Sequence, residues 1–174
     1  MGVKITSSRV AKNLDAFLRS VQSKSAAVGF FSEAKYPDGK GTPVAYVASI
    51  QEFGTDKIPP RPFMRPAISS NKSELTRVMQ AITVKASAGN ITYEQGLAQA
   101  GMAAEGFVRK AIIKVTEPAL AASTMRWRMY SKSKDFNYTK GKGAPDPNVS
   151  NKPLVWTGHM LGSVASKVIG KGSM

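Results

Sequence analysis

The chain has a single histidine, His159, which is the first residue to consider for catalysis. An activated nucleophile that depends on histidine would need His159 as its base, with a carboxylate to orient the ring. The surrounding segment 158–163, Gly-His-Met-Leu-Gly-Ser, has no nucleophile elbow, and no carboxylate lies near it in sequence. We interpret His159 as a surface or turn residue. A hydrolase that uses His159 is the least favoured of three functional hypotheses.

Other residue types that could do chemistry are absent or badly spaced. The chain has no cysteine, which excludes thiol catalysis, zinc fingers and disulfides. The glycine and lysine residues in 39–42 and 141–143 lack the spacing of a phosphate-binding loop and are not followed by an apolar helix. The acidic residues that flank loops have no partner in sequence: Glu33, Asp38, Glu52 and Asp56. We therefore predict no enzyme, no cofactor and no metal site.

The most unusual segment is residues 52–67, where four of the chain's 10 prolines fall within eight residues. Each proline fixes its own φ and favours an extended conformation in the residue before it. Residues 58–62 should therefore form a stiff, extended rod, and Gly54 before it suits a turn with positive φ. Because arginines 61 and 65 flank Phe63 and Met64, the segment is rigid, basic and apolar, which is typical of a contact surface.

A second basic segment covers residues 131–151 and has almost no aliphatic residues. In this segment and at the residue before it, aromatic and basic residues interleave: Tyr130, Phe136 and Tyr138 with Lys132, Lys134, Lys140 and Lys142. Such a pattern binds single-stranded nucleic acid in some proteins, and in others it is a solvated loop whose aromatics pack on a neighbouring subunit. This composition cannot build a core, so we expect an arm that is disordered in free protomers and ordered in an assembly. The tail after Gly170 should also be loose.

Charge and length narrow the remaining functions. The formal net charge is +14, which favours polyanions or acidic protein surfaces as partners. A chain of 174 residues suits one domain, here 1–174. No apolar run reaches about 18 residues, so we expect a soluble protein made in a cytoplasm.

Periodicity predicts several helices and a few short strands. For 44–53 the pattern fits either element, and the alanine, glutamine and glutamate content favours a helix. Thr92 is expected to cap a helix, with Gln95 at the capping-box position, and Ser7 or Ser8 to cap the first helix. The other predicted helices cover 8–24, 66–86 and 92–115, with a helical turn over 123–127, and the predicted strands cover 26–31 and 164–169. Within the helix predicted over 92–115, Gly96, Gly101 and Gly106 would let another backbone approach closely.

Three segments of the chain carry a family resemblance: residues 45–67, 118–128 and 152–163. Residues 45–54 (AYVASIQEFG) and 58–67 (IPPRPFMRPA) resemble the "A-x-I-x-E-F-G" and "I-P-x-R-P-F-[LM]-R-P" segments of the neck, or tail-completion, proteins of tailed bacteriophages. Residues 118–128 and 152–163 are similar to that family's "P-L-x-x-x-T-x-x-R/K" and "K-P-L-x-x-T-G-x-L-x-x-S", in the same order. Two features depart from the family. Trp156 stands where Asp or Asn is common, and 129–151 is longer than expected.

The resemblance implies an α+β fold, with a small mixed or antiparallel sheet packed by several helices and long loops or an arm. It implies a non-enzymatic virion protein, made in the host cytoplasm, that joins the DNA-filled head to the tail. The implied partners are other copies in a cyclic ring of six, head-completion or connector proteins, and tail terminator or tail tube proteins. The ring would enclose the DNA channel, where non-specific DNA contact is compatible with the charge. The alternative is a basic nucleic-acid-binding protein.

The expected assembly residues lie in the proline segment and near the two tryptophans. Phe53, Ile58, Phe63 and Met64 should anchor the rod in the core or in a neighbour's groove, and for Phe53 the core is the simpler expectation. The full set is Phe53, Gly54, Ile58, Pro59, Pro60, Arg61, Pro62, Phe63, Met64, Arg65, Trp127, Trp156, Thr157 and Gly158.

Overall fold

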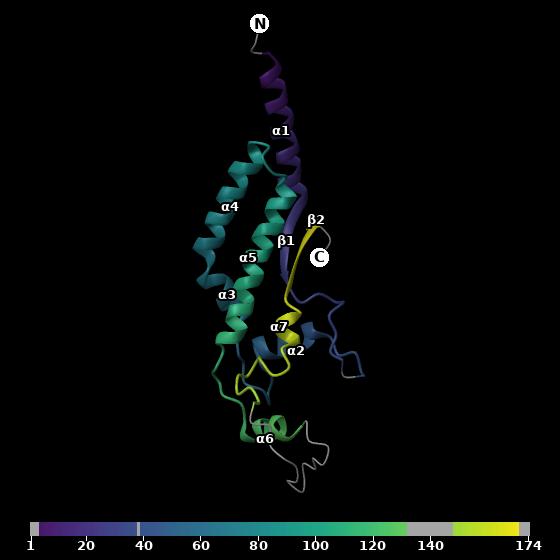
Figure 1. Cartoon of the computed structure of the whole chain (residues 1–174), viewed down its shortest axis with the longest axis vertical. Helices are drawn as coiled ribbons and strands as arrows, with labels where there is room; N and C mark the ends of the chain where they lie inside the picture. Colours follow the sequence, from purple (N-terminus) through teal and green to yellow (C-terminus); the bar gives the residue numbers. More distant parts are fainter. Residues whose placement is uncertain (1–3, 38, 132–147, 171–174) are drawn as a thin grey trace. The chain divides into compact units, whose positions relative to one another are not determined.

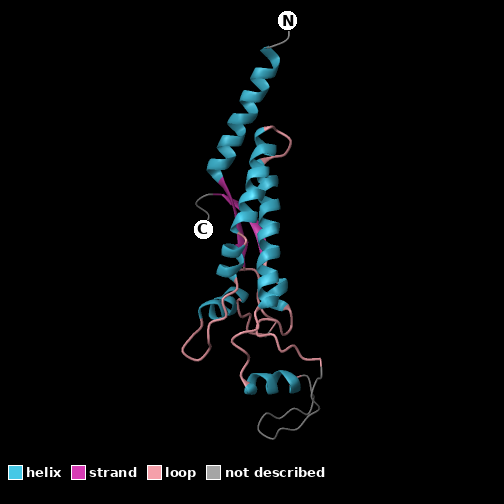
Figure 2. Cartoon of the chain, turned by 90° about the vertical axis from the view of Figure 1, so that its left-hand side faces the viewer, coloured by secondary structure: helices cyan, strands magenta, loops and turns pink. Residues whose placement is uncertain are grey.

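The structure is a computed structural model that describes residues 4–37, 39–131 and 148–170. Within these residues it contains seven helices and one two-stranded antiparallel sheet, so the predicted α+β class is confirmed (Figures 1 and 2). The helices are α1 (Lys4–Ser23), α2 (Val44–Phe53), α3 (Met64–Ser70), α4 (Lys72–Ser87), α5 (Tyr93–Lys114), α6 (Ala122–Tyr130) and α7 (His159–Gly162). The strands are β1 (Lys24–Gly29) and β2 (Ala165–Gly170). The arm predicted for 131–151 lies mostly outside the described residues.

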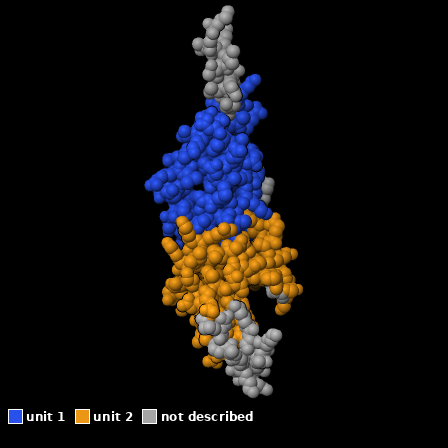
Figure 3. Space-filling view, in the orientation of Figure 1, with its two compact units in different colours: residues 1–30, 65–108, 164–174 blue, residues 31–64, 109–163 orange. Residues whose placement is uncertain are grey.

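The chain divides into two compact units, each built from segments that are distant in sequence (Figure 3). Unit 1 contains residues 1–30, 65–108 and 164–174, and unit 2 contains residues 31–64 and 109–163. The expectation of one domain over the whole chain stays a prediction. No helix in the described residues is both long enough and apolar enough to cross a membrane.

Unit 1 contains the sheet, in which β1 and β2 pair antiparallel from Lys24 opposite Gly170 to Gly29 opposite Ala165. Both strands were predicted, and their boundaries differ from the prediction by only one or two residues. Helix α5 packs against β2 at Gly101, where an added Cβ would lie only 2.9 Å from the Cβ of Ser166. The close approach expected at this glycine is therefore confirmed, whereas at Gly106 a Cβ would meet no atom within 4 Å.

The core of unit 1 lies along the predicted apolar stripe of α5. The side chains of Leu97, Ala100, Ala104 and Val108 are buried, together with Ile82 and Ala86 of α4. The capping box at the start of α5 is confirmed. The Gln95 N–H donates to the Thr92 hydroxyl oxygen at 3.1 Å, and the Thr92 N–H donates to Gln95 Oε1 at 3.0 Å.

Two local predictions are wrong, and one short helix was missed. The single helix expected over 66–86 is interrupted at Asn71, whose side-chain Nδ2 donates to the Ala67 carbonyl at 2.8 Å. That side chain competes with the backbone for helix hydrogen bonds, which the apolar periodicity does not show. Ser7 and Ser8 do not cap the first helix, because α1 already begins at Lys4. The short helix α7 was not predicted.

Candidate assembly site

The proline segment begins with a turn that only glycine can make. Gly54 has φ 76°, in the left-handed region, and an added Cβ would lie 2.9 Å from the Ile58 carbonyl oxygen and from Pro60. Thr55 and Ile58 exchange two backbone hydrogen bonds at 2.8 and 3.2 Å, which closes the turn. The turn sends the prolines back along the end of α2, as the backbone N–H of Arg61 donates to the Gln51 carbonyl at 2.6 Å.

Glu52 fixes the far end of the proline segment. Its side chain is buried, and its Oε2 accepts hydrogen bonds from the backbone N–H groups of Phe63 at 2.7 Å and Met64 at 2.9 Å. Met64 is the first residue of α3, whose first N–H groups have no partner within the helix. The sequence did not indicate these hydrogen bonds of Glu52, because the two N–H groups belong to the backbone 11 and 12 residues away.

Burial alternates along the segment as in any extended chain, where successive side chains point to opposite sides. Pro60 and Pro62 are exposed, while Arg61 and Phe63 are 5% and 1% exposed. The expectation that the arginine belongs to an exposed basic surface is therefore wrong. Arg61 donates from Nε to the Pro118 carbonyl at 2.7 Å, from Nη2 to the Ala119 carbonyl at 3.0 Å and from Nη1 to Gln51 at 3.5 Å.

A second buried arginine, Arg128 of α6, was not singled out in the sequence. Its Nη1 donates to the carbonyls of Ser150 at 3.0 Å and Lys152 at 2.9 Å, and its Nη2 donates to the Pro153 carbonyl at 3.0 Å. Burial lowers the pKa of Arg128, and the nearby charge of Arg61 lowers this pKa further. The one signal for Arg128 in the sequence is its place in segment 118–128, which resembles the phage family.

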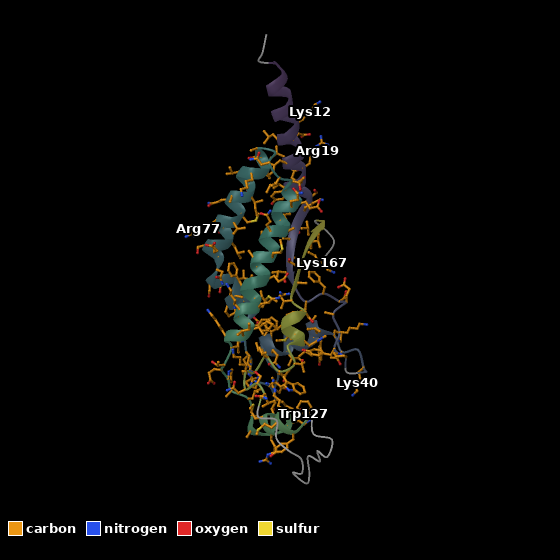
Figure 4. All side chains as sticks on the ribbon, viewed as in Figure 1. Lys12, Arg19, Lys40, Arg77, Trp127 and Lys167 are labelled. Carbon is orange, nitrogen blue, oxygen red and sulfur yellow. The ribbon has the colours of Figure 1, made fainter. Side chains whose placement is uncertain are left out.

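The two tryptophans lie together, as expected for an aromatic cluster. The rings of Trp127 and Trp156 make an edge-to-face contact with centroids 4.6 Å apart, and Arg128 lies 5.8 Å from the Trp156 ring centroid. The tryptophans are 42% and 36% exposed, and Figure 4 marks Trp127 on α6. Large aromatic side chains that remain this exposed are common anchors in protein interfaces.

The structure separates the predicted assembly residues by exposure. Phe53 was expected in the core, but it is 66% exposed, because the buried face of α2 runs through Val44, Ala48 and Glu52 at intervals of four. Phe63 is a core residue and cannot be a free anchor. The other exposed members are Pro59, Pro60, Pro62, Arg65, Thr157 and both tryptophans, and the half-buried ones are Gly54, Ile58, Met64 and Gly158. An assembly role for the exposed members stays a prediction.

His159 borders a pocket of about 340 Å³ in unit 2. Its Nε2 lies 2.8 Å from the Lys35 carbonyl oxygen, which can only accept, so Nε2 carries the proton. The ring of Tyr36 lies 4.8 Å from the imidazole, and burial raises the pKa of this phenol. The hydrogen bond makes His159 a structural link between the turn at Lys35 and α7.

Comparisons of the chain with protein families, with curated proteins and with solved structures found no match.

Proposed function

We propose that this chain is a structural protein of a tailed bacteriophage, which joins the DNA-filled head to the tail in the neck and has no enzymatic activity. One observation carries the proposal: the three segments that resemble neck proteins meet within unit 2. Arg61 of the first segment binds the carbonyls of Pro118 and Ala119 in the second. Arg128 of the second binds those of Lys152 and Pro153 in the third.

The contacts give a structural role to the residues of this chain that carry the resemblance. In "E-F-G" followed by "R-P-F-M", the glutamate caps two backbone N–H groups, the glycine makes the turn, and the arginine bridges to the next segment. The carboxylate of Glu52 and most of the described hydrogen bonds of Arg61 hold backbone groups in place. This arrangement supports a rigid scaffold for contacts between proteins rather than a reactive centre.

The proposed assembly is a cyclic ring with contacts between different faces of neighbouring subunits, closing at six copies. The exposed prolines of the rod form one face, and the tryptophan pair forms another. A stiff segment loses little conformational freedom on docking, which favours the rod as a contact element. The net charge of +14 per protomer opposes ring closure, so we expect closure on an acidic neighbouring ring or around DNA.

Inactivation of the gene in a phage that carries it tests the proposal. We expect electron micrographs of the lysate to show DNA-filled heads and separate tails, with tailed particles restored when the protein is supplied in trans. Unchanged numbers of tailed, infectious particles would refute the proposal.

The basic nucleic-acid-binding alternative makes a different prediction. Binding that depends on phosphate contacts weakens steeply with salt, with a slope of about −0.9 per contact on duplex DNA. A specific, nanomolar gel shift of the isolated protein at about 0.2 M salt would favour the alternative over the neck protein.

A further inference from the structure

Both buried arginines line one pocket of about 360 Å³ in unit 2, between the rod and α6. Its polar lining consists of Arg61, Arg128, Lys57, Gln51 and Thr124. Its remaining lining is Ile58, Pro59, Ala119, Leu120, Ala121 and Pro153. We call it the arginine pocket.

The arginine pocket concentrates positive charge without a compensating acid. None of its lining residues is an aspartate or glutamate, and neither arginine forms an ion pair with any carboxylate in the described part of the chain. Carbonyl oxygens hold the guanidinium groups in place but do not neutralise them. Buried charges in proteins are normally paired, so two like charges that line one pocket favour an anion there.

The guanidinium groups also retain donors for an anion. Each has five N–H groups, and the hydrogen bonds within the described residues use three of them. The two that remain on Arg61 and the two on Arg128 suit the planar oxygen pair of a carboxylate.

We propose that the arginine pocket binds the carboxylate of an acidic side chain on a partner protein. Both arginine residues are less than one-tenth exposed, so a group that projects from its own backbone reaches them best. A glutamate side chain projects in this way, whereas the phosphates of duplex DNA follow the surface of a wide helix. The exposed Pro59 at the rim is rigid and apolar, which suits a protein surface around the inserted acid.

The inference names the partner chemistry of the proposed assembly surface and, in that respect, rests on the proposed function. Its test is made on the isolated full-length protein with octaglutamate as the probe. We expect the ¹⁵N–¹H resonances of the Arg61 and Arg128 side chains to shift and saturate with octaglutamate. Sodium chloride at equal ionic strength, or duplex DNA of equal charge, should leave them unshifted. Arginine resonances that do not respond, or that respond equally to all three probes, would overturn the proposal.

A pair of variants locates the binding. Thr124→Asp places a carboxylate inside the arginine pocket, so affinity for octaglutamate should fall at least tenfold. Ser123→Asp adds the same charge to the same first turn of α6, at an exposed position that does not line the pocket. The Tm of Thr124→Asp should exceed that of Ser123→Asp by about 2–4 °C. Equal affinities in the two variants would refute the inference.

The outcome can be separated from that of the proposed function. Gene inactivation reports on head–tail joining whether or not octaglutamate binds. If neck assembly fails without the protein while the arginine resonances stay unshifted, the pocket inference alone is wrong.

Discussion

Replacement of Glu52 by alanine removes the carboxylate that caps the proline segment. The two hydrogen bonds lost are charge-assisted, and each such bond stabilises a protein by about 1.5–3 kcal/mol. The Phe63 N–H would remain buried without its acceptor, which adds to the cost. We therefore expect the free energy of unfolding to fall by at least about 3 kcal/mol, which is large for a point mutation.

Glutamine at the same position separates the hydrogen bonds from the charge. Its carbonyl oxygen can still accept from one or both N–H groups, and neutral hydrogen bonds contribute about 0.5–1.5 kcal/mol each. We expect Glu52→Gln to lose about half as much stability as Glu52→Ala. Glu117→Gln is the matched control, because this exposed glutamate accepts only one described hydrogen bond, from the Ala119 N–H at 3.0 Å. It should cost less than about 1 kcal/mol.

Urea unfolding followed by tryptophan fluorescence suits this comparison. Both tryptophans of the chain, Trp127 and Trp156, lie in unit 2 with Glu52, so the signal reports the unit that the mutation affects. A shift of the midpoint at constant slope would measure the loss of stability directly. A loss below about 1 kcal/mol for Glu52→Ala, or equal losses for Glu52→Gln and Glu117→Gln, would refute the capping role.

Three further predictions concern packing, exposure and pH. Gly101→Ala should lower the Tm, because overpacking against β2 costs about 1–3 kcal/mol. Gly106→Ala should raise the Tm, because alanine stabilises a helix by up to about 1 kcal/mol relative to glycine and the added Cβ meets no atom. Equal Tm shifts of the two variants in calorimetry would contradict the contact with β2. Phe63→Ala should lower the free energy of unfolding by about 3–5 kcal/mol in urea titrations, because the side chain is buried. Phe53→Ala should lower it by less than about 1 kcal/mol and yet weaken head–tail joining, because the side chain is exposed. A destabilised Phe53→Ala protein with normal joining would exclude Phe53 from the assembly surface. Because burial raises the pKa of Tyr36 in the folded state, its contribution to stability is complete below its unfolded pKa of about 10 and is lost as pH rises through the folded pKa. Tyr36→Phe should therefore lose less stability between pH 9 and 11, and identical pH profiles would contradict this.

Local features of the molecule could be predicted from the sequence because their causes are local. The capping box joins residues three apart, and the turn at Gly54 follows from the conformational freedom of glycine before prolines. The preference of 44–53 for helix over strand also proved correct from residue composition. The α5 stripe was visible because it persists over several turns.

The candidate site was harder to predict because its contacts are distant in sequence. Arg61 reaches carbonyls 57 and 58 residues away, and Arg128 reaches carbonyls 22 to 25 residues away. Every residue type has a backbone carbonyl, so the sequence does not show which carbonyls accept hydrogen bonds from the two arginines. The exposure of Phe53 follows from which face of α2 is buried. Val44, Ala48 and Glu52 form that face, and Phe53 does not belong to it.

A cryo-EM reconstruction of the head–tail junction of a tailed phage that carries the gene for this chain tests the proposed neck role most directly. The account predicts a ring built from copies of this protein between the head and the tail, with the exposed prolines and the tryptophan pair at contacts between proteins. A junction that contains no copy of the chain would contradict the account.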